Sequence, residues 1–163
     1  MSRVYLSLGS NQSPGRHLRA AVAALRERFR RVEVSPAYRS ASVGFDGHPF
    51  INLAVSLDTD MEPLDLKGWL HALEDREGRR RDQPRFSNRT LDIDIVFVDQ
   101  RIIDADGLRI PRQEWCQPFV LKPMLDLEPE FREPLSGETL ARLWPVHQPP
   151  AGTLQLVDLS QLD

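Results

Sequence analysis

The sequence predicts an α+β protein, a ferredoxin-like βαββαβ sandwich with C-terminal additions. Four segments have the composition and alternation of strands, namely residues 3–9, 32–39, 50–58 and 91–98. Apolar side chains at three- and four-residue steps predict a helix after the first and after the third of these segments. The resulting order is typical of an antiparallel sheet that carries its helices on one face. Because this fold serves many functions, it does not by itself indicate an activity.

The first helix and the second strand have recognisable boundaries. A Ser-Pro pair at residues 13–14 supplies an N-cap and a first-turn proline, and the apolar stripe predicts a helix that runs to about Arg30. Residues 32–39, which read VEVSPAYR, form the second predicted strand. Pro36 cannot donate to a strand ladder and indicates an edge or a bulge at that point. Residues 40–49 contain two glycines and a proline and predict a loop.

The second helix and the last main strand follow in the same manner. Residues 50–58 predict the third strand, Pro63 lies at the start of the second helix, and Gly78 is expected to end it. Residues 91–98, which read LDIDIVFV, give the strongest strand signal in the chain. Beyond them we expect a short strand, two short helices and a proline-rich tail at residues 145–163, whose role the sequence does not indicate.

Length and composition indicate one globular domain. The chain has 163 residues, of which 40% are apolar and 28% charged, so we expect residues 1–163 to form a single domain and to act as a monomer. A single cysteine, Cys116, excludes an internal disulfide and favours a cytoplasmic location. A secretory signal and a membrane-spanning apolar stretch are not found, so no membrane partner is expected. The net charge of −3 disfavours a nucleic-acid partner.

The sharpest chemical signal is the string RTLDIDI at residues 89–95. Side chains alternate along a strand, so Asp92 and Asp94 are expected on one face, about 7 Å apart. Mg²⁺ prefers one or two carboxylates together with phosphate oxygens and water, and two such ions can orient a triphosphate for in-line attack. A bare D-x-D pattern is also typical of a solvated strand face, and that alternative stays open at this point.

Arginines lead into the same strand. Between Arg76 and Arg89 there are six arginines and only two acidic residues. Guanidinium groups bind phosphate with two hydrogen bonds, so Arg79, Arg81 and Arg85 beside the carboxylates favour a nucleoside-triphosphate site. The alternative is a solvated helix end followed by a charged loop. The chain contains neither a G-x-x-x-x-G-K-[ST] nor a G-x-G-x-x-G motif, so it is not a P-loop or dinucleotide-binding protein.

A second group of residues suits a flat heterocycle. Asn52 offers a donor and acceptors that can recognise an amide-like ring edge. Phe50 and Phe119 can sandwich a flat ring, although aromatic residues of this kind are also common in a core.

These residues resemble one family, the 6-hydroxymethyl-7,8-dihydropterin pyrophosphokinases of folate biosynthesis. The resemblance covers roughly residues 3–143. It rests on Leu8-Gly9-Ser10-Asn11, Tyr38-Arg39-Ser40 with Val43-Gly44, Phe50-Ile51-Asn52, Glu74, Gly78-Arg79, Arg89-Thr90-Leu91-Asp92-Ile93-Asp94, and Phe119-Val120-Leu121 with Pro123. It implies an enzyme that transfers pyrophosphate from ATP to the hydroxymethyl oxygen of the reduced pterin and releases AMP.

The resemblance also implies roles for individual residues. Asp92 and Asp94 would ligate two Mg²⁺ ions, with ATP as the co-substrate. The catalytic residues that it implies are Arg79, Arg89, Asp92 and Asp94. The residues that it implies on the nucleotide side are His71, Glu74, Arg79, Arg81, Arg89 and Arg112. The residues that it implies on the pterin side are Ser40, Val43, Phe50, Asn52 and Phe119.

The sequence departs from the family pattern on the nucleotide side. The family has Pro-His after its short strand, whereas this chain has Pro111-Arg112, and arginine cannot titrate near neutral pH. An arginine usually precedes the Phe-Val-Leu run, where this chain has Gln117-Pro118. Two alternatives therefore accompany an active pyrophosphokinase. One is a divergent homologue that binds pterin or nucleotide with weak or altered transfer. The other is an RNA-binding module, which the exposed carboxylates disfavour because they repel phosphate.

Overall fold

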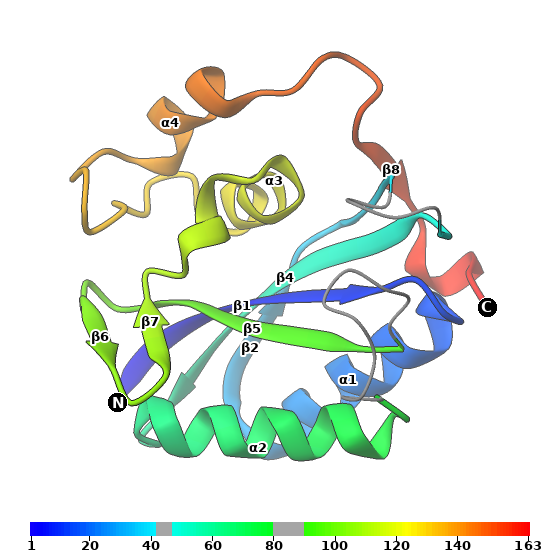
Figure 1. Cartoon of the computed structure of the whole chain (residues 1–163), viewed down its shortest axis with the longest axis horizontal. Coiled ribbons are helices and arrows are strands. Elements are labelled where there is room, and N and C mark those ends of the chain that lie inside the picture. Colours follow the sequence, from blue (N-terminus) through cyan, green and yellow to red (C-terminus); the bar gives the residue numbers. More distant parts are fainter. Residues whose placement is uncertain (42–46, 80–89) are drawn as a thin grey trace.

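The computed structural model describes residues 1–41, 47–79 and 90–163, which form a six-stranded antiparallel sheet, a separate hairpin and helices on both faces of the sheet (Figure 1). The strands of the sheet are β1 (Ser2–Ser10), β2 (Arg30–Val34), β3 (Ala37–Ser40), β4 (Phe50–Thr59), β5 (Asp92–Val98) and β8 (Gln155–Val157). Their order is β5-β1-β4-β3-β8, and β2 also pairs with β4. The hairpin consists of β6 (Ile103–Ala105) and β7 (Leu108–Ile110).

The helices lie between groups of these strands in the sequence. They are α1 (Pro14–Arg28), α2 (Pro63–Arg76), α3 (Pro118–Leu127) and α4 (Leu140–His147), together with the 3₁₀ helices η1 (Gln113–Cys116) and η2 (Leu159–Gln161). The prediction of an antiparallel sheet with helices is confirmed. Within the described residues, no helix is long and apolar enough to span a membrane.

The segment predicted as one strand at residues 32–39 is instead two strands. β2 ends at Val34 and β3 begins at Ala37, and both pair with β4. Between them, Ser35 takes over the pairing: its N–H donates to the carbonyl of Ala54, and its hydroxyl accepts from the N–H of Ala54 at 2.8 Å. Pro36 follows, and its missing N–H prevents a continuous ladder. Pro36 therefore divides the predicted strand into two, at the point where an edge or a bulge was expected.

The helices cover the two faces of the sheet in different ways (Figure 1). α1 and α2 pack on one face, where they bury side chains such as Leu18 and Leu70 against strand residues such as Leu6. Full burial of one such leucine contributes roughly 1.5–3 kcal/mol. The two helices of the predicted βαββαβ unit thus share one face, as expected. α3 and α4, which belong to the C-terminal additions, pack on the opposite face. Their core includes Leu121, which packs against Phe97.

Two hydroxyl–carboxylate hydrogen bonds fix the end of α3 to the sheet. Tyr5 of β1 donates to Glu128, and Tyr38 of β3 donates to Asp126. Burial and the neighbouring carboxylate raise the pKa of both tyrosines, so both hydroxyls keep the proton that they donate. α3 and α4 cover only part of this face, and the cavity described below occupies the part over the ends of β1 and β4.

The C-terminal tail returns to the sheet and completes its edge. β8 pairs with β3, and η2 lies against α1. The contact with α1 is close: a β-carbon on Gly15 would lie 2.2 Å from the carbonyl oxygen of Leu162, so only glycine fits there. Arg19 donates to the carbonyls of Leu159 and Leu162 at 2.8 and 2.7 Å. The tail therefore covers the edge strand that leads to Ser40.

Candidate active site

Polar side chains line up across three neighbouring strands. In the registers of β1 with β5 and β4, Gly9 lies opposite both Asp92 and Asn52, and Ser7 lies opposite Asp94. Directly opposed residues of an antiparallel pair point to the same face, so all of these residues share one face. Ile93 points the other way, into the core. The alternation that the sequence predicted thus places the two carboxylates together, with side-chain exposures of 25% and 28%.

A cavity of about 680 Å³ opens over this face. It is walled by the sheet, by α2, by the β6–β7 hairpin and by the start of α3. Because β5 is the edge strand of the sheet, the cavity continues past that edge to α2. The predicted site residues that line it are Ser40, Phe50, Asn52, His71, Glu74, Arg79, Asp92, Asp94, Arg112 and Phe119.

Arg79 is bound to one of the two carboxylates. Its Nη1 lies 2.6 Å from Asp92 Oδ1 and 3.4 Å from Glu74 Oε2. Glu74 is 2% exposed, and the same Oε2 also accepts the backbone N–H of Ile93 at 2.7 Å. Ile93 lies between the two aspartates on the strand edge. Glu74 therefore supports both the strand that carries the carboxylates and the arginine beside them.

Arg112 is bound to the other carboxylate. Its Nε lies 3.4 Å from Asp94 Oδ2 and 3.3 Å from Glu114 Oε2. This arginine follows β7 and stands at the position where the sequence departs from the family pattern. Both of its ion pairs are partly exposed, so each is worth little as a stabilising contact. The pairs place a cation at the cavity wall beside Asp94.

The surroundings of Asp94 change its protonation. Burial, and after it the negative charge of Asp92, raise the pKa of Asp94 to about 7, although the nearby Arg112 opposes the effect. Two carboxylates this close favour a cation between or beside them. The oxygen ligands suit a hard ion such as Mg²⁺, which completes its coordination with water and phosphate. Among the described residues, no group of three or more His, Cys, Asp or Glu gathers into a metal site.

The opposite end of the cavity is neutral. Asn52 is 6% exposed, and its Oδ1 has no hydrogen-bond partner among the described residues. A buried carbonyl without a donor costs about 1–3 kcal/mol, so a ligand that supplies an N–H would gain this contact. Phe50 lies two residues before Asn52 and pairs with Ser40 of β3. Phe119 reaches the same cavity from the first turn of α3.

Three of the predicted site residues cannot be placed. Val43, Arg81 and Arg89 lie outside the described residues, as does Arg85. Conversely, the cavity wall contains cations that the sequence argument missed. Lys67 lies one helical turn before His71 on α2, and its Nζ donates to the carbonyl of Gly107 at 2.9 Å. The four-residue step from Lys67 to His71 was a signal of a shared helix face.

Arg109 was missed for a different reason. It lies on β7 and lines the cavity opposite α2. A charged residue in a short exposed hairpin carries no sequence signal of its own, because its position depends on where the hairpin packs.

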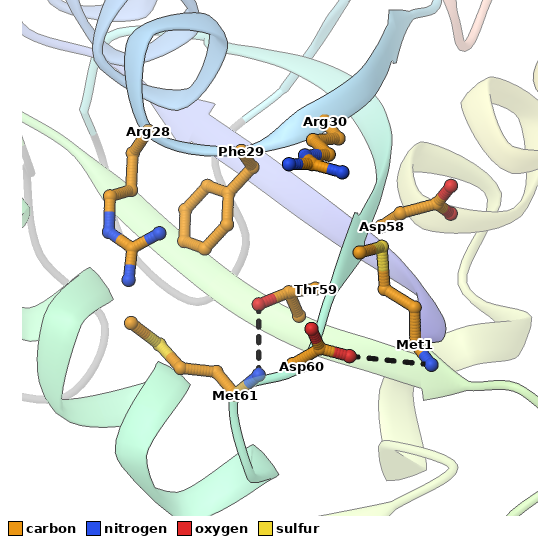
Figure 2. Close-up of a pocket in the computed structure, with 8 residues that line it drawn as sticks. All are labelled: Met1, Arg28, Phe29, Arg30, Asp58, Thr59, Asp60 and Met61. Atoms are coloured by element: carbon orange, nitrogen blue, oxygen red, sulfur yellow. Dashed lines mark hydrogen bonds and ion pairs between the residues drawn. The ribbon is translucent and has the colours of Figure 1, made fainter.

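A second cavity, of about 370 Å³, lies at another place in the molecule (Figure 2). Its two carboxylates are already paired. Asp60 contacts the amino group of Met1 at 3.4 Å, and Asp58 contacts Arg3 at 3.0 Å. The guanidinium of Arg28 lies over the ring of Phe29. Among the described residues, this cavity has no buried polar side-chain atom without a partner, whereas the larger one has Asn52 Oδ1 and Arg79 Nε. The larger cavity is therefore the candidate active site.

Comparisons with known proteins show the family of this chain. The model of the 7,8-dihydro-6-hydroxymethylpterin-pyrophosphokinase (HPPK) family matches residues 5–129. The chain is 41% identical over 140 residues to the 2-amino-4-hydroxy-6-hydroxymethyldihydropteridine pyrophosphokinase of Pseudomonas aeruginosa, which covers 82% of this chain and 85% of that protein. It is 31% identical over 141 residues to the Haemophilus influenzae protein of the same name, covering 83% of this chain and 88% of that protein.

A solved structure shows the same fold. Wild-type HPPK-DHPS of Plasmodium falciparum superposes with a TM-score of 0.70 at 12% identity, over 90% of this chain and 44% of that chain. This chain therefore spans less than half of that longer protein. The match of the family model to most of the chain, together with the identities above, decides the assignment. The chain belongs to the 7,8-dihydro-6-hydroxymethylpterin-pyrophosphokinase family.

Proposed function

We propose that this chain transfers a pyrophosphoryl group from ATP to the hydroxymethyl group of 6-hydroxymethyl-7,8-dihydropterin and releases AMP, a step of folate biosynthesis. As a member of its family, it is an ATP-dependent pyrophosphokinase. The observation that carries the residue assignment is the row Asp92–Gly9–Asn52, which joins a carboxylate and an unpaired amide on one face of the sheet. Two strand spacings separate its ends, about 10 Å between Cα atoms.

The pterin end of the cavity consists of Gly9, Ser40, Phe50, Asn52 and Phe119. In our proposal Asn52 receives an N–H of the pterin edge, and Phe50 and Phe119 pack against the flat ring. Asn52 is buried, and its unpaired oxygen can accept this N–H without first giving up another partner. Val43 remains a prediction for this end.

The nucleotide end consists of His71, Glu74, Arg79, Asp92, Asp94 and Arg112. We propose that Asp92 and Asp94 hold two Mg²⁺ ions, which, when bound, neutralise the phosphates and stabilise charge on the group in transfer. Arg79 and Arg112 then turn from the carboxylates toward the phosphates. Arg81 and Arg89 remain predictions for this end.

The chemistry follows from the closeness of the two ends. The hydroxymethyl oxygen attacks the β-phosphorus and releases its proton to water, the bond from this phosphorus to the α,β-bridging oxygen breaks, and AMP leaves. Little of this reaction requires a covalent partner from the protein, so orientation and charge stabilisation dominate. The guanidinium groups stabilise negative charge on the moving group, and the aromatic residues hold the acceptor in line.

Several broader properties complete the proposal. We propose that residues 1–163 act as one domain with a ferredoxin-like core, in which β5, β1, β4 and the β2–β3 pair are the four strands. We further propose a cytoplasmic monomer without a nucleic-acid partner. A divergent enzyme with slow transfer is the second candidate, because Arg112 stands where the family has a titratable histidine.

A product assay tests this function. The purified chain is incubated with ATP, Mg²⁺ and the reduced pterin, and both AMP and the pterin diphosphate are measured. Transfer predicts equal amounts of the two products and no AMP when the pterin is omitted. AMP without pterin diphosphate would indicate hydrolysis and contradict the proposal, and chelation of Mg²⁺ should stop both products.

A further inference from the structure

Gly9 is the middle residue of the row that joins the two ends of the cavity. It lies inside β1 and pairs with Asp92 of β5 and Asn52 of β4 in regular antiparallel register. Its backbone is not in the left-handed region, where glycine would be needed for conformation. Glycine within a strand loses entropy and packs no side chain, so its presence here points to a close approach of another group.

That group is the side chain of Asn52. A β-carbon on Gly9 would lie 2.6 Å from Asn52 Nδ2, 3.6 Å from its Cγ and 3.8 Å from Phe50 Cδ1. The first distance is far shorter than a van der Waals contact, so the amide would have to move. Asn52 is 6% exposed, and its Oδ1 is the unpaired atom of the pterin end. Displacement of Nδ2 therefore also displaces the acceptor that a ligand would use.

We propose that Gly9 is a positioning residue: its missing side chain sets the direction of the Asn52 amide, whose oxygen accepts an N–H of the ligand. The ligand that this geometry selects is a flat heterocycle with an N–H at its edge. Gly9 thus acts through Asn52 and not by a contact of its own. The inference rests on the proposed function for the identity of the ligand, and on the structure for the contact itself.

The test compares Gly9→Ala with Gly68→Ala. Gly68 lies on α2 and has no atom within 4 Å of the position of an added β-carbon, so it is a matched control for the chemistry of the substitution. Titration calorimetry with the reduced pterin should show at least a tenfold weaker affinity for Gly9→Ala, about the effect of losing one buried hydrogen bond. Gly68→Ala should bind as the wild type does. Equal affinities for Gly9→Ala and the wild type would overturn the proposal.

A double-mutant cycle separates positioning from general disruption. If Gly9→Ala acts by moving the Asn52 amide, then adding it to Asn52→Ala should change pterin affinity by less than about twofold. Additive losses would show that Gly9 acts independently of Asn52 and would overturn the proposal. If Gly9→Ala fails to fold and the double variant fails as well, the glycine has a structural role independent of Asn52, which also overturns the proposal.

A ligand-free measurement keeps this inference distinct from the proposed function. The side-chain amide of Asn52 gives a pair of ¹H–¹⁵N signals that can be assigned by their loss in Asn52→Ala. Gly9→Ala should shift this pair and leave the side-chain amide pair of the distant Gln100, which donates to the carbonyl of Arg132, in place. An unshifted pair would contradict the contact. If the wild type bound no pterin but the pair shifted, the proposed function would fail and the positioning of the amide would stand.

Discussion

The two ends of the cavity are built in opposite ways. At the pterin end the polar group is neutral, buried and unpaired: Asn52 Oδ1 has no donor among the described residues. At the nucleotide end the titratable groups are paired with each other, Arg79 Nη1 with Asp92 and Arg112 with Asp94, although Arg79 Nε is buried and has no partner among the described residues. The pterin end can therefore bind a ligand directly, whereas the ion pairs of the nucleotide end must break before their groups can contact a ligand.

This difference teaches how each ligand is recognised. A preformed neutral site gains affinity because little has to be reordered on binding. A site of paired charges resists either ligand alone, because an anion meets the carboxylates and a cation meets the arginines. When Mg²⁺ and phosphate bind together, each carboxylate can contact the metal and each arginine can contact the phosphate. We therefore expect metal and nucleotide to bind cooperatively. Each prediction below tests whether the two ends respond separately.

The largest expected effect is at the nucleotide end. Asp92→Ala or Asp94→Ala should weaken Mg²⁺-dependent nucleotide binding by about 100-fold or more, since even groups that only support metal ligands cost 10–100-fold. Pterin affinity should change by less than about threefold, because the pterin end is preformed. Calorimetry with each ligand alone and with both measures this. If either variant binds nucleotide and Mg²⁺ as tightly as the wild type does, that carboxylate is not a metal ligand.

The second prediction concerns the pterin end, where a substitution should weaken pterin binding and leave nucleotide binding unchanged. Asn52→Ala should weaken pterin binding by about 1–3 kcal/mol, the cost of removing a buried hydrogen-bonding partner. Nucleotide affinity should stay within about twofold of the wild type. Asn52→Asp is a useful companion, because it keeps the shape and an acceptor but adds charge beside the pterin. Equal losses for both ligands in Asn52→Ala would show that Asn52 shapes the whole cavity, and the contrast between the ends would fail.

The sequence predicted most of what depends on local alternation. The face shared by Asp92 and Asp94 follows directly from the period of a strand, and α2 begins at Pro63 as its first-turn proline predicted. Asn52 was assigned to a ligand from its chemistry, and the structure adds that its oxygen is unpaired. These features are encoded within a few residues.

Features that depend on long-range packing were not predictable in this way. The tail at β8 returns to β3 across more than a hundred residues, and three mostly exposed residues carry no pattern that names their partner. The same holds for α3 and α4, which lie on the second face of the sheet. The ion pair of Arg79 with Asp92 was not predictable either. The sequence indicates a phosphate ligand for Arg79 and a metal ion for Asp92, and it carries no signal that the two residues bind each other.

The third prediction concerns pH at the nucleotide end. Burial and the charge of Asp92 raise the pKa of Asp94 to about 7, so in the metal-free protein this carboxyl is protonated below that pH. Mg²⁺ must displace the proton, and its affinity should therefore fall by up to about tenfold for each pH unit below 7. Pterin affinity in the absence of metal should not follow this curve. A Mg²⁺ affinity that stays constant from about pH 5 to about pH 7 would contradict the assignment.

The same shift has a consequence for stability. The pKa of Asp94 in the folded protein lies above its ordinary value of 3.8, so the unfolded chain loses this proton first. The contribution of Asp94 to stability is thus fully present below 3.8 and is lost as the pH rises toward about 7. Thermal melting of the metal-free protein across this window, beside Asp94→Asn as the control, measures it. The asparagine variant should lack this component of the pH dependence.

The smallest expected effect belongs to Arg112. Its ion pairs with Asp94 and Glu114 are partly exposed, so Arg112→Ala should change stability by less than about 1 kcal/mol. If Arg112 turns to the phosphates in place of the family's histidine, its removal should lower turnover by about threefold to tenfold, a modest effect among arginines in phosphoryl transfer. Pterin affinity should not change. Arg109→Ala, on the same cavity wall, is the control for general loss of positive charge. If both variants slow the reaction equally, the rate depends on the positive charge of the cavity wall and not on a specific contact between Arg112 and the phosphates.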